Sequence, residues 1–202
     1  MSKQSDRPIY LASRSPRRRE LLAQIGVKFE VIEVDVDEAV VAGESARDYV
    51  ERLAHAKARA GWRRMRQRKL RAAPVLGVDT TVAVGGKILA KPADRREAAR
   101  MLAALSGRKH EVLTAVAVKL DTRLHCALSV SEVVFKPLSA AEIRNYVATG
   151  ECDDKAGAYA IQGHAARFVT RLRGSFSGVM GLPLYETAQL LERMEARPDR
   201  RK

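Results

Sequence analysis

The chain is poor in cysteine, in aromatic residues and in long apolar runs. Among its 202 residues the two cysteines, Cys126 and Cys152, are too few for a disulfide framework or a multi-cysteine zinc site. No stretch reaches the roughly 18 consecutive apolar residues of a membrane helix, and the opening MSKQSDRPIYLAS lacks the apolar core of a signal peptide. We therefore expect no membrane partner and a location in a reducing cytoplasm.

Acidic residues are also scarce relative to basic ones. Lys and Arg together number 37, against 24 Asp and Glu, which gives a formal net charge of +13. A surplus of this size favours an anionic partner, with nucleic acid as the first candidate. The surplus is local, however, because residues 59–71 carry seven basic and no acidic side chains, residues 14–19 carry four basic ones, and residues 193–202 carry a net +3. Each of these segments needs its own explanation.

The composition is that of a globular protein of mixed secondary structure. Hydrophobic residues make up 46% of the chain, and short apolar runs are interspersed with segments of helical spacing. This pattern predicts an α/β fold with a mixed sheet. We expect strands over 9–12, 29–34, 74–78, 81–89 (a hairpin about Gly85-Gly86), 112–120, 124–135 and 168–172. We expect helices from Ser15-Pro16 to Gly26, over 46–68, from Asp94 to Gly107, from Ser139 (with a capping box of Ser139 and Glu142) to Gly150 and over 183–194.

The first candidate site lies where the first predicted strand turns into a helix, at residues 13–18 (SRSPRR). Its arginines stand in the first helical turn, where their positive charge opposes the helix dipole. An anion held by the free amides of the helix N-terminus would remove this conflict, and the serine hydroxyls would add donors to a phosphate. The segment favours a phosphate site, and a solvated basic helix face with a Ser-Pro cap is the alternative.

A second candidate is Asp79, which is followed by two threonines. It comes directly after the apolar residues 74–78, which we expect to be a strand that ends at Asp79. Proteins of the α/β class commonly bind ligands beyond the ends of strands. The carboxylate there would hold Mg²⁺ or accept a proton from water, and a turn aspartate that only caps the strand is the alternative.

Two further segments carry a lysine in a defined setting. Pro92 fixes the backbone after Lys91, which would act on a phosphate as a point charge, although a plain surface lysine explains this pair as well. Residues 150–163 form an aperiodic, glycine-containing stretch with three carboxylates, and long structured loops are often functional. There Lys155 would contact a phosphate and the Gln162 amide the edge of a base, with an acidic solvent loop as the alternative.

Carboxylates also gather after the second predicted strand, at Glu33, Asp35, Asp37 and Glu38. Because Mg²⁺ prefers carboxylate oxygens, some of these side chains would complete a metal site, although by itself the cluster is better explained as a solvated charge run. Cationic loops, an aspartate at a strand end and an acidic cluster are the components of a Mg²⁺-dependent reaction on phosphates. The residues alone leave open whether that reaction is hydrolysis, transfer or mere binding.

Six stretches of the sequence follow the motifs of one known family in order and almost from end to end. They are LASRSPRRRELL (11–22), LAHAKA (53–58), GVDTTV (77–82), ILAKPADRREAARMLAALSGRKHEVLTAVAV (88–118), DKAGAYAIQG (154–163) and GSFSGVMGLPLYET (174–187). Together they resemble the Maf family of nucleoside triphosphate pyrophosphatases. The resemblance implies an elongated mixed sheet flanked by helices, with a cleft between two lobes. It implies one domain over 7–195, and we expect flexible tails at 1–6 and 196–202.

The resemblance also implies a reaction, in which a nucleoside triphosphate is hydrolysed to the monophosphate and pyrophosphate with a divalent metal. We expect Mg²⁺, with Mn²⁺ or Co²⁺ able to substitute. Asp79 matches the family's catalytic aspartate, a general base or metal partner, and Glu38 matches an early acidic residue expected at the metal. A homodimer is a further implication. Substrate-binding and specificity roles are expected for Ser13, Arg17, Arg18, Lys57, Thr80, Lys91, Lys155 and Gln162.

The stretch KAGAYAIQG resembles the family branch that prefers dTTP and UTP. We therefore predict a dTTP and UTP pyrophosphatase, with an enzyme for a modified nucleotide such as 7-methyl-GTP as the alternative. Arg14 departs from the family, which commonly has a small residue there. A rival of another class is a nucleic-acid-binding or cell-division (septum) regulator, supported by the basic run 59–71. That run contains one aromatic residue, Trp62, so it would contact a phosphate backbone rather than stack on bases.

Overall fold

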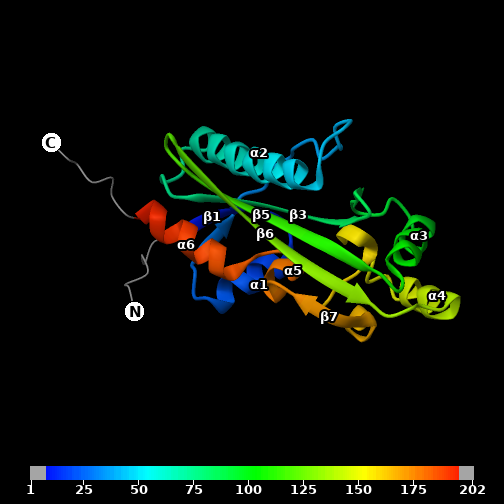
Figure 1. Ribbon diagram of the computed structural model, residues 1–202. Helices are drawn as coiled ribbons and strands as arrows, with labels where there is room; N and C mark the ends of the chain where they lie inside the picture. The colour runs from blue at the N-terminus through cyan, green and yellow to red at the C-terminus, as the bar shows by residue number, and fades with distance from the viewer. Residues whose placement is uncertain (1–7, 196–202) are drawn as a thin grey trace.

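Figure 1 shows a computed structural model of the chain, which describes residues 8–195. The tails expected at 1–6 and 196–202 lie outside the described residues. Within 8–195 the chain forms one mixed sheet of seven strands flanked by helices, which confirms the predicted α/β class. None of the helices in this range is long and apolar enough to cross a membrane.

The elements follow the chain in a mixed order of strands and helices. The strands are β1 (Ile9–Ala12), β2 (Phe29–Val31), β3 (Val75–Val84), β4 (Lys87–Leu89), β5 (Lys109–Leu120), β6 (Arg123–Phe135) and β7 (Val169–Arg173). The helices are α1 (Pro16–Gln24), α2 (Ala46–Gln67), α3 (Arg95–Leu105), α4 (Ala140–Ala148), α5 (Phe176–Met180) and α6 (Leu184–Glu195). Two short 3-10 helices lie at Ala156–Ala158 (η1) and His164–Phe168 (η2).

The sheet has the order β2-β1-β3-β5-β6-β7, and β4 pairs with β3 outside this path. β1 is parallel to β2 and β3, whereas the other pairs are antiparallel. β5 and β6 form a ribbon that runs along most of the molecule and gives it an elongated shape (Figure 1). The ribbon is stable because residues 112–118 of β5 are all buried, between helices on both faces and strands on both edges.

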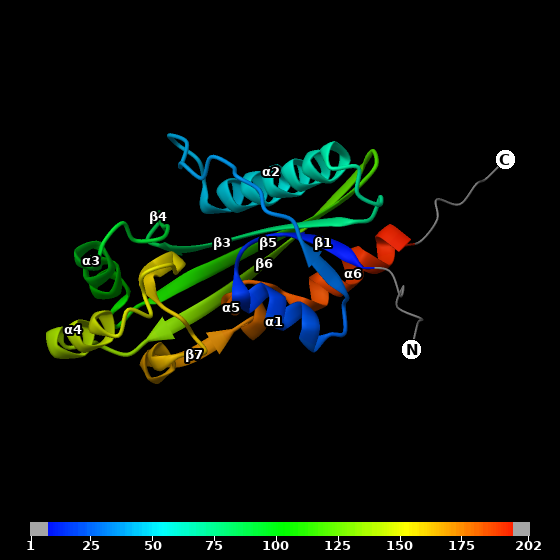
Figure 2. The same ribbon diagram turned by 180° about the vertical axis from the view of Figure 1, so that it is seen from behind.

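Helices cover the two faces of the sheet differently. α2 lies along one face, whereas α1, α5 and α6 lie on the other (Figures 1 and 2). Side chains alternate along β3, so Leu76 and Val78 share a core with α1 and α6, while Gly77 and Asp79 face α2. Neighbouring residues of this one strand therefore reach opposite layers of the molecule.

The contact between β3 and α2 is unusually close at Gly77. A Cβ atom at this position would lie 2.4 Å from the backbone oxygen of Ala54 and 2.4 Å from the backbone nitrogen of Ala58. These are backbone atoms of a helix and cannot move aside independently, so only a glycine admits α2 at this distance. The close approach brings Lys57, which lies between Ala54 and Ala58 on α2, within reach of Asp79 on the strand.

The predicted end of a strand at Asp79 is wrong. β3 continues through this residue, because it pairs with β5 without interruption from Val75 to Ala83 and Asp79 lies opposite Ala115. Residues 79–81 are polar, and a polar run of this kind usually marks the end of a strand. Here the pairing with β5 and the contact with α2 keep these residues in the sheet. The hairpin about Gly85-Gly86 is confirmed, but it is an extension of the same strand into β4.

Smaller differences concern the ends of elements. β2 ends at Val31 rather than at 34, and the short helix α5 was not expected. The capping box of Ser139 and Glu142 is confirmed at the start of α4. The predicted helix over 46–68 is confirmed as α2, which Ser45 caps by accepting a hydrogen bond from the backbone N–H of Asp48.

The buried core falls into clusters on either side of the middle of the molecule. One large cluster joins β3 and β5 to α3 and α4, and includes Val82, Leu102 and Phe135. The others join the opposite end of the sheet to α1, α2 and α6, and include Leu22 and Leu53. The pocket described next is lined by residues from both ends.

Candidate active site

The pocket opens where one edge of β3 has no partner strand in the described sheet. β1 pairs with β3 up to Gly77, and β4 pairs with it from Val82 onward, so residues 78–81 lie between the two partners. The chain leaves β1 at Ala12 and turns there into α1. A cavity of about 520 Å³ lies at this gap and is lined from both ends of the molecule.

The structure brings to this pocket every residue to which the family resemblance assigned a catalytic, metal or substrate-binding role. They come from the β1–α1 loop, the loop after β2, α2, β3, the segment after β4 and the loop around η1. The lining includes Ser13, Arg17, Arg18, Glu38, Lys57, Asp79, Thr80, Lys91, Lys155 and Gln162. Of the acidic cluster, Asp35 and Glu38 line the pocket, whereas Glu33 and Asp37 do not.

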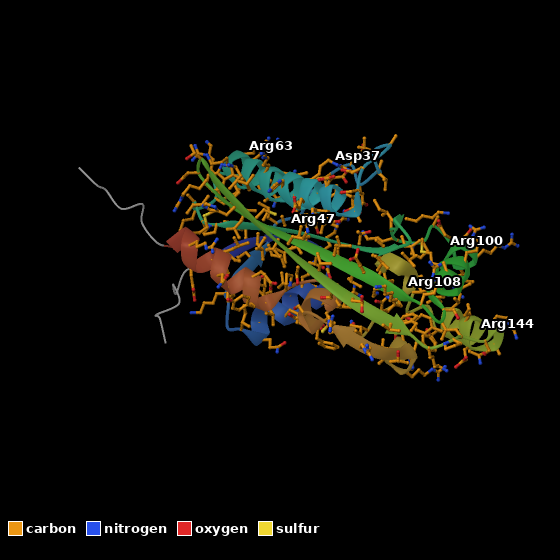
Figure 3. The ribbon with its side chains drawn as sticks, in the orientation of Figure 1. Asp37, Arg47, Arg63, Arg100, Arg108 and Arg144 are labelled. Carbon is orange, nitrogen blue, oxygen red and sulfur yellow. The ribbon has the colours of Figure 1, made fainter. Side chains whose placement is uncertain are left out.

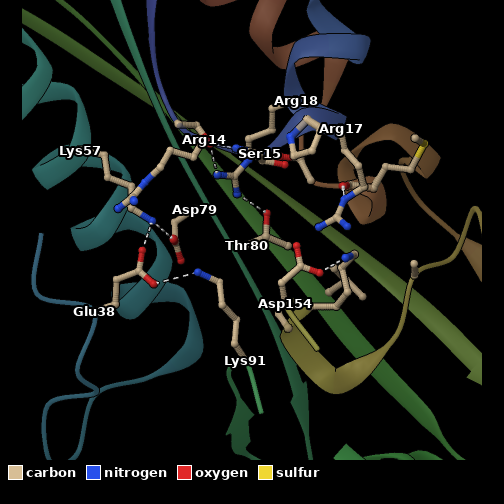
Figure 4. Close-up of a pocket in the computed structure, with 18 of the residues that line it drawn as sticks. Arg14, Ser15, Arg17, Arg18, Glu38, Lys57, Asp79, Thr80, Lys91 and Asp154 are labelled. Atoms are coloured by element: carbon tan, nitrogen blue, oxygen red, sulfur yellow. Dashed lines mark hydrogen bonds and ion pairs between the residues drawn. The ribbon is translucent and has the colours of Figure 1, made fainter. Parts of the chain in front are cut away.

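Lys57 joins two carboxylates at the centre of the site (Figure 4). Its Nζ lies 2.6 Å from Asp79 Oδ1 and 2.6 Å from Glu38 Oε1. Lys57 and Asp79 are both buried, whereas Glu38 is half-exposed and also receives a hydrogen bond from Lys91 Nζ at 3.1 Å. Two lysines and two carboxylates thus form one continuous network, which fixes the orientation of the Asp79 and Glu38 carboxylates.

Burial affects the two carboxylates differently. It raises the pKa of Asp79 above the usual range, although Lys57 and Arg18 act in the opposite direction. Burial would also raise the pKa of Glu38, but the hydrogen bond and charge of Lys57, together with Lys91, lower it to about 2. Asp79 is therefore the stronger base of the two, and Glu38 remains a carboxylate at any ordinary pH.

The loop that carries Glu38 is attached to α2 by two residues that the sequence did not single out. Tyr49 Oη donates to the backbone oxygen of Glu38 at 3.0 Å. Arg52 donates to both carboxylate oxygens of Glu44, at 2.6 and 2.7 Å, and to the backbone oxygen of Ala39 at 3.0 Å. A tyrosine and an arginine on an amphipathic helix give no local signal of this role, because their partners lie in a loop without regular structure.

Arg18 is directed into the protein and acts as a clamp. Its guanidinium donates to the backbone oxygen of Gly181 at 2.9 Å, to Ser13 Oγ at 3.0 Å and to Thr80 Oγ1 at 3.2 Å. These bonds tie α1, β3 and the end of α5 together at the wall of the pocket. Two of the predicted substrate-binding hydroxyls, those of Ser13 and Thr80, are thereby held in place.

The remaining cations differ in their partners. Lys155 pairs with Asp154, and the Arg17 Nε donates to the backbone oxygen of Met180 at 3.3 Å. Arg14 lines the pocket and extends toward Lys57 in Figure 4, and no carboxylate within residues 8–194 pairs with it. Arg14 and Arg17 are therefore pocket cations whose charge no carboxylate of the described chain neutralises.

The loop with Lys155 and Gln162 is held against β3 by backbone conformation. Gly157 and Ala158 have φ angles of 67° and 60°, in the left-handed region. A Cβ on Gly157 would lie 2.7 Å from a methyl group of Val82, so the loop packs directly on the strand. A non-glycine residue with positive φ is uncommon, and at Ala158 the surrounding core maintains it.

The pocket also has an apolar side that sequence reasoning did not identify as a site. Val112, Tyr159 and Met180 line it. Tyr159 is fixed from behind, since its hydroxyl lies 2.9 Å from Nε2 of the buried His110. A pocket with one apolar side and one charged side is the arrangement expected for a ligand with a flat apolar part and an anionic part.

The pocket offers a metal ion two carboxylate ligands rather than a complete set of protein ligands. In the described part of the chain no group of three or more His, Cys, Asp or Glu side chains gathers to hold a metal. Glu38 and Asp79 nevertheless approach the same ammonium group, so both can face one cation. Mg²⁺ is usually held by one or two carboxylates plus the phosphates of a substrate, and the donor set fits that pattern.

Comparison with known proteins adds a family to this geometry. The sequence profile described as Maf-like protein matches residues 8–194. A protein of Aromatoleum aromaticum named dTTP/UTP pyrophosphatase is 57% identical over 193 residues, which cover 91% of this chain and 94% of that protein. One of the same name from Cupriavidus pinatubonensis is 53% identical over 195 residues, covering 94% and 98%.

A solved structure is more distantly similar. The nucleoside-triphosphatase / dITP/XTP pyrophosphatase of Mycobacterium abscessus aligns over 95% of this chain and 100% of that chain, with 17% identity and a TM-score of 0.49. A similarity at this level carries no conclusion about the site.

Proposed function

The chain belongs to the family of Maf-like proteins, and from this premise we propose that it hydrolyses nucleoside triphosphates, dTTP and UTP first. The products are the nucleoside monophosphate and pyrophosphate. The identity with relatives named dTTP/UTP pyrophosphatase extends over nine-tenths of the chain, and the pocket has the charge and the apolar wall that such a substrate requires.

One arrangement carries the proposal more than any other: a buried carboxylate of raised pKa surrounded by cations. Asp79 accepts a proton from a water molecule as that water attacks the α-phosphorus. The new P–O bond forms as the bond from the α-phosphorus to the oxygen bridging the β-phosphorus breaks, and pyrophosphate leaves with the bonding electrons. Lys57 holds the Asp79 carboxylate in one orientation and stabilises its charge until the proton is taken up.

Cationic side chains neutralise the negative charge that shifts onto the leaving pyrophosphate. Arg17, Lys91 and Lys155 line the pocket and would contact the triphosphate with their charged groups. Ser13 and the N-terminus of α1 would add hydroxyl and amide donors, and Arg18 keeps the Ser13 hydroxyl in position. Lys91 and Lys155 are each paired with a carboxylate. On substrate binding each lysine would therefore exchange its carboxylate partner for a phosphate.

Glu38 and Asp79 are the residues that would hold a divalent metal ion together with the phosphates, with Mg²⁺ expected and Mn²⁺ or Co²⁺ as substitutes. Such an ion supplies charge stabilisation to the phosphate oxygens. Glu38 is suited to this role because its low pKa keeps it ionised.

The base would be recognised at the Gln162 end of the pocket. The amide of Gln162 has one acceptor and two donors, which can match the adjoining carbonyl and N–H of a uracil or thymine edge. Tyr159 supplies an apolar wall beside it, and the Thr80 hydroxyl is fixed by Arg18. A modified purine such as 7-methylguanine remains the alternative, because it too presents a carbonyl beside an N–H.

The test is product analysis on a panel of nucleotides with Mg²⁺, using the wild type and Asp79→Asn. We expect pyrophosphate and monophosphate from dTTP and UTP, and a large loss of rate in the variant. Release of orthophosphate, or an unimpaired variant, would contradict the mechanism. A preference for 7-methyl-GTP would change only the substrate.

The homodimer implied by the resemblance and the cytoplasmic location expected from the composition stay predictions. Sedimentation or light scattering of the purified chain tests the homodimer, and cell fractionation tests the cytoplasmic location.

A further inference from the structure

The second half of α2 and the four residues that follow it carry a dense group of positive charges that the pocket does not use. We call it the basic patch: the seven Arg and Lys side chains of residues 59–71, all of which are exposed. None of them lines the pocket. Arg63, labelled in Figure 3, lies on the outer side of α2, and most of the length of the sheet separates it from Arg100 and Arg144 at the other end.

The first half of the same helix has balanced charge. Arg47 pairs with Glu51 at 3.7 Å, and Arg52 pairs with Glu44 at 2.6 Å. In contrast, no carboxylate between residues 8 and 194 pairs with a member of the basic patch. Like charges four residues apart, such as Arg59 and Arg63, repel each other on a helix. The helix dipole favours cations only within the last turn, so it offsets this repulsion for only part of the patch.

The spacing of three arginines suits a chain of phosphates. Arg59, Arg63 and Arg66 follow the i, i+4, i+7 pattern and therefore lie in one stripe along the helix, which spans about 10 Å at 1.5 Å per residue. Phosphates along one strand of a duplex advance by about 3.4 Å each, so the stripe can reach several of them. Six of the seven patch residues are arginines, whose planar group binds phosphate through two hydrogen bonds.

Other anionic partners fit this surface less well. A membrane-surface helix needs a free apolar face, but the apolar face of α2 packs on the sheet through Val50, Leu53 and Met65. Single-stranded nucleic acid needs exposed aromatic rings. Trp62 is partly buried, and the ammonium of Lys119 lies 5.7 Å from the centre of its ring.

We propose that the basic patch binds the phosphate backbone of double-stranded nucleic acid, without sequence preference and independently of the pocket. The contact is electrostatic, and the patch stays available when a nucleotide occupies the site, because the two share no side chain.

The test is fluorescence anisotropy of a labelled random-sequence DNA duplex titrated with the full chain at several salt concentrations. Three phosphate contacts predict a log–log slope of affinity against salt of about −2.7, a fall of about 40-fold between about 50 and about 200 mM salt. In the triple variant Arg59→Ala/Arg63→Ala/Arg66→Ala we expect most of this slope to disappear, while the rate of nucleotide hydrolysis stays unchanged.

The matched control is Arg96→Ala/Arg100→Ala/Arg144→Ala. It removes the same charge from exposed helix positions at the other end of the molecule. We expect this control to retain the slope of the wild type. The proposal is overturned if the wild type does not bind the duplex, if both triple variants lose affinity equally, or if the patch variant binds as before. Binding to vesicles rich in anionic lipid without binding to the duplex would overturn it in favour of a membrane.

Discussion

The pocket and the basic patch are both rich in cations, but their surroundings differ. In the pocket Lys57, Lys91 and Lys155 each have a carboxylate partner, and Arg18 is bonded to hydroxyl and carbonyl oxygens. In the patch the cations are exposed and have no carboxylate partner among the described residues. Paired and partly buried charges have a defined direction, which a reaction at one phosphorus atom requires. Solvated charges suit a duplex that is bound only through its phosphate backbone and without sequence preference.

Salt and burial separate the two regions physically. Interactions between exposed charges are screened over about 8 Å at physiological ionic strength, whereas a buried pair is screened far less. Duplex binding by the patch is therefore expected to weaken steeply with salt, and the geometry around Asp79 is expected to persist. Four perturbations, ordered from the largest expected effect, test this separation.

The largest effect is expected for Asp79→Asn. The amide cannot accept the proton of the attacking water, so the rate of hydrolysis should fall by about a thousandfold, within the range typical of a lost general base. Affinity for the duplex should stay the same. Steady-state pyrophosphate release and duplex anisotropy measure the two quantities. A variant that loses both activities would contradict the independence of the two regions, and its circular dichroism spectrum would show whether folding is the cause.

The second effect concerns stability. Lys57→Met leaves the buried Asp79 carboxylate without its main counter-charge, and breaking a buried pair in this way costs about 3–5 kcal/mol of unfolding free energy. Arg63→Met removes an exposed charge from the same helix and should change stability by no more than about 0.5 kcal/mol. Urea denaturation measures both. Equal losses in the two variants would show that the burial of the pair has no energetic consequence.

The third effect depends on pH. Burial lowers the pKa of His110 to about 4, while in the unfolded chain the imidazole has its ordinary pKa of about 6.5. Between these values the unfolded chain binds a proton that the folded chain does not. Stability is therefore lost as the pH falls through this window, by up to about 3 kcal/mol.

Thermal or urea unfolding at several pH values checks this expectation against His110→Gln, which should lose less stability on acidification. Other acids titrate in the same window, so the quantity to compare is the difference between the two proteins. Arg63→Met leaves His110 in place and should therefore show the same pH dependence as the wild type. A wild type and a His110→Gln variant with parallel profiles would refute the assignment.

The smallest effect is expected for Arg14→Ala. Arg14 is exposed, lines the pocket and has no carboxylate partner in residues 8–194, so its charge is available to a phosphate. Loss of one partly screened, charge-assisted contact should raise KM about tenfold and leave kcat nearly unchanged. Arg19→Ala is the control, because Arg19 is also exposed and lies close by, on α1, but does not line the pocket. A similar KM in both variants would remove Arg14 from the substrate contacts.

Much of the fold follows from local patterns. The ribbon of β5 and β6, the helix α2 and the capping box at Ser139 were all expected, because each is long or has a specific terminal signal. In contrast, the continuity of β3 through Asp79 was not expected. A run of aspartate and two threonines resembles the end of a strand, and only the neighbouring strand β5 and the covering helix α2 allow it to remain in the sheet.

The site shows the same division. Motif order identified residues as distant as Ser13 and Gln162, and both line one pocket. The sequence did not reveal that Lys57 serves two carboxylates, that Arg18 is directed inward, or that Tyr49 and Arg52 hold the loop of Glu38. Those relations depend on distances between elements, and no single element contains the information.

Gly77 has a consequence for how readily this protein tolerates mutation. The residue has no side chain and takes no part in any proposed step, yet every amino acid that could replace it adds at least one carbon atom 2.4 Å from the backbone of α2. Each replacement would push the helix outward and draw Lys57 away from Asp79. A random substitution at this position is thus expected to reduce activity as surely as one at a charged residue of the pocket, and a mutational scan should show Gly77 among the least replaceable positions in the chain.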